Sequence, residues 1–388
     1  MKKSMYISLF GTIFAAGIII GLVLFINTDD NKKAEENHAA QNQELYQKES
    51  VQVLEDTVKV VSTDDGEINA NNLRIPWTVN KSENTFFLSQ RDGNIVEIDG
   101  DFGLVEVQTV DVSETIYHEG QAGFLGFELA PDFEDSNQAF AYHTYEKDGE
   151  ILNRIVSLTL EDNTWKEENV LLDGIPGGDM NTGGRIAIGP DNMLYATTGD
   201  TGQPDTAQDL DNLAGKILRM ELDGAIPEDN PFESSYVYTY GHRNSQGLAW
   251  DEQGKMYSSE HGEDGHDEIN LIEAGNNYGW PVIQGDEEAE DMVAPIHHSG
   301  EETWAPSGMA YNDGELFVAS LAGSQIFTYN IADQEVNEFF DDAGRLRDVM
   351  IDENALFTIT NNHDDRGNPS QEDDRLIHIS LTGEVSGD

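Results

Sequence analysis

A two-part pattern of apolar runs recurs along the chain from about residue 71 onward. Each copy has a short apolar and aromatic run, a polar loop rich in Gly, Asn and Asp, and a second run rich in Ile and Leu. Short runs bounded by turn residues are typical of β-strands, and amphipathic helix periodicity is scarce. The six pairs of runs are 85–88 with 94–98, 139–142 with 153–158, 193–196 with 216–220, 255–258 with 267–272, 315–318 with 325–329, and 355–358 with 374–379.

The six copies follow one another at a mean spacing of about 54 residues, which is in the range of the β-repeat proteins. Regular β units at this spacing predict an all-β fold, a six-bladed β-propeller. A β-sandwich with irregular loops is the alternative. In a propeller, the loops between the two runs of each unit lie at one mouth of the central channel, and we expect ligand chemistry there.

The N-terminal segment has a different pattern. Lys2 and Lys3 precede an uncharged, mostly apolar run over residues 4–27, and about 20 apolar residues span a bilayer. No small-residue cleavage motif follows, so we interpret the run as a transmembrane anchor helix, with a cleaved signal peptide as the alternative. Positive charge before the run and acid after it place the body outside the cell. The predicted domains are an anchor at 1–27, a polar linker at 28–70 and the propeller at 71–388.

The composition narrows the classes of function. The 388-residue chain has 75 Asp and Glu against 21 Lys and Arg, a formal net charge of -54. This charge excludes a protein that binds nucleic acid or anionic lipid by bulk electrostatics. The acidic residues are dispersed rather than held in blocks, so they fit a salt-rich habitat better than disorder. The chain has no cysteine, which excludes disulfides, thiolate metal sites and thiol nucleophiles.

Three arginines stand out in the predicted loops. Arg243 lies in the segment 241–247, and Arg345 and Arg347 form an Arg-x-Arg step that would point both guanidiniums to one face of a strand. Together they would form a cationic pocket for a multiply charged anion, because guanidinium groups match carboxylates and phosphates. The alternative is that each arginine pairs with a nearby Asp or Glu.

Two further loops carry possible ligand chemistry. Carboxylates and carbonyls cluster around glycines in 259–268, which suits Ca²⁺, although the spacing matches no EF-hand and an acidic turn is the alternative. The loop 177–185 is rich in glycine, which allows a close approach of the backbone to a ligand. It is not a phosphate-binding P-loop, because no Gly-Lys-Ser/Thr follows.

These segments together resemble the soluble sugar dehydrogenases that depend on pyrroloquinoline quinone (PQQ), the glucose/sorbosone and aldose sugar dehydrogenase type. The resemblance runs from about Leu73 to Ile379. The matching segments are 73–77, 123–126, 130–133, 175–177, 183–185, 189–191, 198–200, 214–219, 229–232, 241–244, 246–249, 267–270, 277–281, 305–307 and 345–349.

The resemblance implies a six-bladed propeller and a hydride transfer from the anomeric carbon of an aldose to PQQ, assisted by a His base and by Ca²⁺. By position, the backbone carbonyls of Gly262 and Glu263 would bind the Ca²⁺, and Arg243 would also steady charge that develops on the quinone. The residues that would contact the cofactor are Gln121, Arg243, Asn244, Gln246, Arg345 and Arg347.

The chain departs from this family at the catalytic base. The family's His lies four residues before the Arg of the Gly-Arg step, and here that residue is Asn181. An amide cannot accept a proton near neutral pH, whereas an imidazole can.

Three interpretations follow from this departure. The protein is a dehydrogenase in which His118, His261 or a Ca²⁺-polarised water takes the proton, or a surface module that binds PQQ or sugar without fast turnover, or a scaffold for protein contacts. A calcium-dependent lactonase propeller has a similar outline, but its motifs fit poorly.

The expected partners follow from the resemblance and the anchor. We expect a sugar substrate and a single-pass protein of the cell membrane with an extracellular propeller. An enzyme tethered there suits electron delivery to a membrane quinone or a cytochrome, and nothing in the sequence identifies that acceptor.

Overall fold

The computed structural model describes residues 58–62, 68–101 and 103–381. The predicted anchor and most of the predicted linker lie outside these residues. Among the described residues, no helix has the length and hydrophobicity that crossing a membrane requires. The described chain is almost entirely β, with one short α-helix, α2 (Phe133–Ser136), and one 3₁₀ helix, η1 (Pro204–Gln208).

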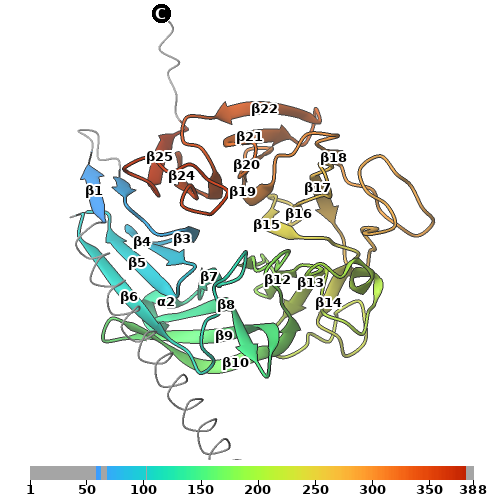
Figure 1. The fold of residues 1–388 in the computed structure, drawn as a ribbon, viewed down its shortest axis with the longest axis horizontal. Helices are drawn as coiled ribbons and strands as arrows, with labels where there is room; N and C mark the ends of the chain where they lie inside the picture. The colour runs from blue at the N-terminus through green and yellow to red at the C-terminus, as the bar shows by residue number, and fades with distance from the viewer. Residues whose placement is uncertain (1–57, 63–67, 102, 382–388) are drawn as a thin grey trace, which may run out of the picture. The chain divides into compact units, whose positions relative to one another are not determined.

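The described strands form six antiparallel units that follow one another around a centre (Figure 1). The first two units join through a parallel pairing of β6 with β10. In chain order the units are β3 (Pro76–Ser82), β4 (Thr85–Gln90), β5 (Asn94–Asp99) and β6 (Val105–Asp111); β7 (Phe124–Leu129), β8 (Gln138–Lys147), β9 (Glu150–Glu161) and β10 (Thr164–Pro176); β11 (Ile186–Ile188), β12 (Leu194–Thr198), β13 (Lys216–Met220) and β14 (Val237–Tyr240); β15 (Ser245–Trp250), β16 (Met256–Glu260), β17 (Glu268–Ile272) and β18 (His297–His298); β19 (Pro306–Asn312), β20 (Glu315–Ser320), β21 (Gln325–Asn330) and β22 (Glu335–Phe340); and β23 (Leu346–Asp352), β24 (Ala355–Thr360) and β25 (Leu376–Ser380) with β2 (Ile68–Asn71) and β1 (Lys59–Ser62).

The first strands of successive units contact one another and close a ring. β3 contacts β7, β7 contacts β11, β15 contacts β19, β19 contacts β23, and β23 returns to β3, while β15 contacts β12 of the preceding unit. This is a β-propeller-like fold, as the repeat pattern predicts. The six predicted pairs of runs form the two middle strands of the six units, from β4 with β5 to β24 with β25. They were visible in the sequence because the middle strands are buried on both faces, so they read as continuous apolar runs.

The last unit contains both ends of the described chain. Residues up to 70 were predicted to be linker, but β1 and β2 pair with each other and Ala70 of β2 pairs with Leu376 of β25. Beyond the pair of Ala70 and Leu376, the Leu73 amide donates a hydrogen bond to the Asp374 carbonyl at 2.8 Å. The Asn72 amide donates one to the Glu372 carbonyl at 3.0 Å. Each of the two strands has only four residues, which is too short for a periodic pattern to emerge from the sequence.

Aromatic side chains fill the spaces between neighbouring units. Trp165 is fully buried and packs against Phe87, Phe127 and Phe133 at ring-centroid distances of 6.1, 5.0 and 6.0 Å. Its indole N–H donates to Gln108 Oε1 at 2.7 Å. Burial of each large side chain contributes about 1.5–3 kcal/mol, so such clusters fix the positions of the inner strands, on which the site depends.

A cavity in the middle of the ring is lined by residues of all six inner strands, β3, β7, β11, β15, β19 and β23. It holds a buried ion pair, Arg185 Nη1 with Asp348 Oδ2 at 3.1 Å, and the half-buried Glu128. Burial raises the pKa of Glu128 to about 8, with the charge of Asp348 adding to this and the charge of Arg185 opposing it. The folded protein therefore favours the protonated form of this carboxyl.

Glu128→Gln is expected to flatten the pH dependence of stability. A carboxyl whose folded pKa is raised contributes stability that is full below about pH 4.5 and is lost as pH rises through about 8. The wild type should therefore lose more thermal stability between pH 5 and pH 9 than the variant, in melting curves recorded at constant ionic strength. The exposed Glu252→Gln is the control, and a Glu128→Gln profile parallel to the wild type would contradict the assignment.

Candidate functional site

A cavity at the end of the inner strands brings together part of the predicted site. Gln121, Gln246 and Arg347, three of the six predicted cofactor contacts, line it together with Trp77 and His261. Trp77, Gln246 and Arg347 lie on inner strands, Gln121 lies in the loop before β7, and His261 directly follows β16, so the residues belong to different units. The structure therefore assembles in one place residues that are far apart in the sequence.

Asn244 and Gln246 hold the glycine-rich loop against this cavity. Asn244 Oδ1 accepts hydrogen bonds from the Gly183 amide at 3.0 Å and from Gln246 Nε2 at 3.2 Å. Gln246 Nε2 also donates to the Gly183 carbonyl at 3.0 Å. Gly183 has φ +64°, and a Cβ there would lie 2.6 Å from the Thr197 carbonyl oxygen. Only glycine fits this position, which explains the glycine in the sequence.

Arg347 is the buried cation of the site. Its side chain is about 5% exposed and lies over the Trp77 ring at 5.6 Å. Nη1 donates to Gln246 Oε1 at 3.0 Å and to Ser307 Oγ at 3.3 Å, whereas Nε has no partner. Burial lowers the pKa of Arg347 to about 9, against the attraction of Asp364. A buried guanidinium with an unsatisfied donor is costly unless an anion joins it.

Arg243 and Arg345 lie near the cavity but do not line it. Arg243 Nη1 donates to the His261 carbonyl at 3.3 Å, and its guanidinium lies over the Trp280 ring at 5.4 Å. Arg345 is half-buried, its Nε has no partner, and burial lowers its pKa. None of the ion pairs found among the described residues includes Arg243, Arg345 or Arg347. The alternative of simple pairing with neighbouring acids therefore does not account for them.

Asn181 occupies a strained backbone position with both of its hydrogen-bond donors committed. Its φ is +47°, a region in which Asn and His are enriched. Its amide N–H donates to Gln121 Oε1 at 2.8 Å, and Nδ2 donates to Asp200 Oδ1 at 2.9 Å. Asp200 is buried and also accepts from Trp280 Nε1 at 2.9 Å. Asn181 therefore keeps Oδ1, an acceptor that cannot serve as a base.

The two histidines considered as alternative bases differ in position. His118 is exposed and does not line the cavity. His261 lines it, and its Nδ1 lies 3.3 Å from Asn244 Nδ2. Burial lowers the pKa of His261 to about 3, and the charges of Arg347 and Arg243 contribute. Its imidazole is therefore neutral across the physiological range but only weakly basic.

The predicted calcium loop is tied down by one of its own acids. Asp267 Oδ1 accepts the Gly262 amide at 2.9 Å, and Oδ2 accepts the amides of Trp304 and Ala305 at 2.6 and 2.8 Å. In the described part of the chain, no group of three or more acidic or His side chains is arranged to hold a metal. The predicted ligands, the carbonyls of Gly262 and Glu263, are backbone groups, so their role stays a prediction.

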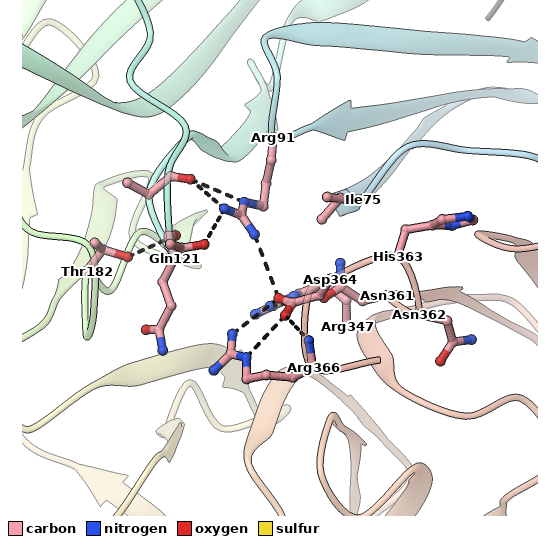
Figure 2. A network of polar contacts seen from close by, with 12 residues as sticks. Ile75, Arg91, Gln121, Thr182, Arg347, Asn361, Asn362, His363, Asp364 and Arg366 are labelled. Carbon is pink, nitrogen blue, oxygen red and sulfur yellow. Dashed lines mark hydrogen bonds and ion pairs between the residues drawn. The ribbon is translucent and has the colours of Figure 1, made fainter. Parts of the chain in front are cut away.

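Three charged residues that line the cavity are not among the site residues predicted from the sequence. Arg91, Asp364 and Arg366 line it beside Arg347 (Figure 2). Arg91 directly follows β4, and the other two follow β24. All three therefore lie in loops between the paired runs, where the repeat pattern placed the ligand chemistry. That position was the signal that would have found them.

Comparison with known proteins gives consistent matches. The family model described as Glucose / Sorbosone dehydrogenase matches residues 73–368. The chain is 35% identical over 235 residues to quinoprotein glucose dehydrogenase B of Acinetobacter calcoaceticus, covering 52% of this chain and 49% of that relative. It is 30% identical over 270 residues to aldose sugar dehydrogenase YliI of Escherichia coli, covering 60% and 72%. The PQQ-bound aldose sugar dehydrogenase from Streptomyces coelicolor superposes with a TM-score of 0.75 at 34% identity, covering 84% and 98% of the two chains.

Proposed function

The chain belongs to the glucose/sorbosone dehydrogenase family, and from this premise we propose that it is a PQQ- and calcium-dependent oxidoreductase that oxidises aldoses at the anomeric CH–OH. The matched segment spans only about half of the glucose dehydrogenase relative, 49%. The observation that carries the proposal is the cationic cavity in which Arg347 is buried without an ion pair, next to Gln121 and Gln246.

The charged side chains in and beside this cavity are complementary to a ligand with several carboxylates. The Nε atoms of Arg345 and Arg347 are buried donors with no partner, and such donors favour an anionic acceptor. Trp77, which is about 2% exposed, lies against the Arg347 guanidinium and holds it in place. We propose that the cofactor is held by Gln121, Arg243, Asn244, Gln246, Arg345 and Arg347.

The bound cofactor supplies the acceptor for a hydride; the protein's own residues orient the sugar and handle the proton. Arg243, half-buried over Trp280, places a positive charge where negative charge develops. Asn181 Oδ1 accepts a hydrogen bond from a neighbouring hydroxyl of the sugar and so positions the reacting hydroxyl, whose own proton is left to His261; Asp200 holds the amide in that orientation. His261 is the neutral imidazole of the cavity that takes the proton. Its low pKa makes it a weak base, so we expect slow turnover.

A second candidate is a weakly active or inactive surface propeller that binds PQQ, a sugar or a protein partner. The observation that favours it is Asn181 at the position of the family's base. Both candidates share the cofactor site and differ only in turnover.

The test uses the full chain, purified in a mild detergent with Ca²⁺ and high salt. PQQ is titrated by absorbance, and a panel of aldoses is then offered with an artificial dye as electron acceptor. Binding with dye reduction supports the dehydrogenase, and binding without it supports the second candidate. No binding at micromolar PQQ would contradict both and leave the scaffold interpretation.

Calcium removal is expected to abolish dye reduction, because Ca²⁺ polarises the quinone oxygens. Chelation should also weaken PQQ binding at least tenfold, and added Ca²⁺ should restore both. Gly262→Ala should mimic chelation, because the added methyl group would collide with the carbonyls of Gly265 and His266. Gly149→Ala, where a Cβ meets open space, is the control for general destabilisation. Unchanged activity after chelation would remove calcium from the proposal.

We further propose that residues 1–27 anchor the protein in the cell membrane with the propeller outside, and that a membrane quinone or a cytochrome accepts the electrons. The apolar run and its flanking charges support the anchor. These residues lie outside the described part of the chain.

A further inference from the structure

Arg91 and Arg366 contact one carboxylate beside the cavity, with Arg347 nearby (Figure 2), and the charge of that carboxylate also acts on Arg345 and Arg347. We call Arg91, Arg345, Arg347 and Arg366 the arginine cluster. The carboxylate is Asp364, whose side chain is about 4% exposed. It lies 3.7 Å from Arg91 Nη1, and its oxygens accept from Arg366 Nε at 3.1 Å and Nη2 at 3.2 Å.

Asp364 is the strongest attractive charge acting on Arg91, Arg345 and Arg347. Burial alone would raise the pKa of Asp364, but its hydrogen bonds with Arg366 and the charges of Arg366 and Arg347 lower it to about 2. Asp364 is therefore ionised at every pH at which the protein works. One carboxylate is therefore in contact with two cations and attracts two more.

The other acids near the cluster are engaged elsewhere or exposed. Asp374 accepts the amides of Ile75 at 3.2 Å and His363 at 3.3 Å, and Asp365 is exposed to solvent. Two guanidiniums, those of Arg91 and Arg366, contact Asp364, and those of Arg345 and Arg347 form no ion pair among the described residues, so the cluster holds more cations than anions. In a chain of net charge -54, such a local excess needs a reason, because buried like charges repel one another.

One guanidinium nitrogen of Arg91 makes no hydrogen bond among the described residues and is available to a ligand in the cavity. Its Nε and Nη2 donate to the Ala122 carbonyl at 3.2 and 3.0 Å, and Nη2 also donates to the Gly120 carbonyl. The remaining nitrogen, Nη1, reaches Asp364 only at 3.7 Å, which is beyond hydrogen-bond distance. A ligand carboxylate would satisfy this donor. Arg366, about half exposed, offers its guanidinium at the outer side of the same cavity.

We propose that Arg91 and Arg366 belong to a tricarboxylate-binding site together with Arg345 and Arg347, and that Asp364 is a positioning residue that fixes the two. The inference rests on the proposed function in one respect: it takes the natural ligand to be PQQ, whose three carboxylates would neutralise the positive charge of the cluster. Arg91 comes from the first unit and Asp364 and Arg366 from the last, so the site spans the junction between these two units.

The test measures binding, independently of turnover. PQQ and benzene-1,3,5-tricarboxylate are titrated into the full chain, with absorbance as readout for PQQ and the shift in melting temperature for both. Arg91→Gln and Arg366→Gln should each weaken both ligands about tenfold or more, since each removes a charge-assisted hydrogen bond. The loss should shrink as salt rises, because salt screens the charges. Arg375→Gln is the matched control, since Arg375 lies in the same loop but pairs with Asp373 at 2.9 Å.

The Asp364→Asn variant distinguishes a positioning role of Asp364 from the purely electrostatic effect of its charge. Removal of a negative charge would by itself tighten binding of an anion. If Asp364 instead fixes Arg91 and Arg366, the variant should bind both tricarboxylates more weakly, at a far-ultraviolet circular dichroism spectrum equal to that of the wild type. Tighter binding would overturn the positioning role.

The outcomes also separate this inference from the proposed function. Wild-type affinity in Arg91→Gln and Arg366→Gln overturns the inference and leaves the dehydrogenase in place. Binding of the benzene tricarboxylate but not of PQQ, with loss in both variants, supports the site and removes PQQ as its ligand. Binding of neither compound to the wild type overturns the inference.

Discussion

Asn181→His is expected to raise the rate of aldose oxidation by about 10²–10⁴, the usual contribution of a general base. The geometry for an imidazole is already present. Asp200 Oδ1 lies 2.9 Å from Asn181 Nδ2, and an imidazole Nδ1–H at that place would make the same hydrogen bond. Cδ2 would then take the place of Asn181 Oδ1, and Nε2, unprotonated, would lie one bond beyond it. The left-handed backbone at φ +47° accepts His as well as Asn.

The pH profile tests this reasoning more sharply than the rate alone. Dye reduction by Asn181→His should acquire a limb that rises with pH as the new imidazole loses its proton, and the wild type should lack it. In the double variant Asn181→His/Asp200→Asn most of the gain should disappear, because Asp200 fixes the tautomer. A single variant that binds PQQ normally and shows no gain would mean that the missing step lies elsewhere.

Asp348→Ala is expected to destabilise the fold by about 3–5 kcal/mol, the cost of leaving one partner of a buried ion pair alone. Asp348 Oδ2 lies 3.1 Å from Arg185 Nη1 and accepts the Val79 amide at 3.1 Å. Both side chains of the pair are about 7% exposed, and Arg185 Nη2 already lacks a partner. Removal of the Asp348 carboxylate would leave the charge of Arg185 uncompensated in the middle of the ring.

Urea unfolding of the full chain measures this loss. Glu161→Ala breaks the exposed pair between Lys166 and Glu161 and should leave the stability almost unchanged, because solvent screens such a pair. The paired substitution Arg185→Met/Asp348→Leu should recover much of the stability, because apolar residues can replace a buried ion pair. Equal losses in Asp348→Ala and Glu161→Ala would show that the central pair contributes no more than a surface pair.

The strands at the middle of each unit were predictable because their signal is local. The apolar composition of a run such as Phe86-Phe87-Leu88 indicates by itself that the run is buried. β1 and β2 were not, because their pairing depends on a partner strand at the other end of the chain. No local pattern in two four-residue segments distinguishes such a strand from a linker.

The residues of the site also divide into those that the sequence could predict and those that it could not. Resemblance to a family identified Gln121, Gln246 and Arg347, and the structure places all three on one cavity. It also identified Asn181 as a departure. Only coordinates could show that Asp200 commits the Asn181 amide as a donor, so that an acceptor remains. The resemblance did not include Arg91 and Asp364: their place between the paired runs pointed to the channel mouth, but their pairing depends on ring closure.

That closure has a consequence for the order of events during synthesis. The Ile75 amide donates a hydrogen bond to Asp374 Oδ2, 299 residues further along the chain. The ring therefore cannot be completed until the last unit has been synthesised. Long-range pairing of this kind slows folding. Because Arg91 and Asp364 face each other across that junction, a polyanion bound there would stabilise the completed ring over any open form. If PQQ is that polyanion, completed rings would open less often and resist proteases better in a medium that contains it.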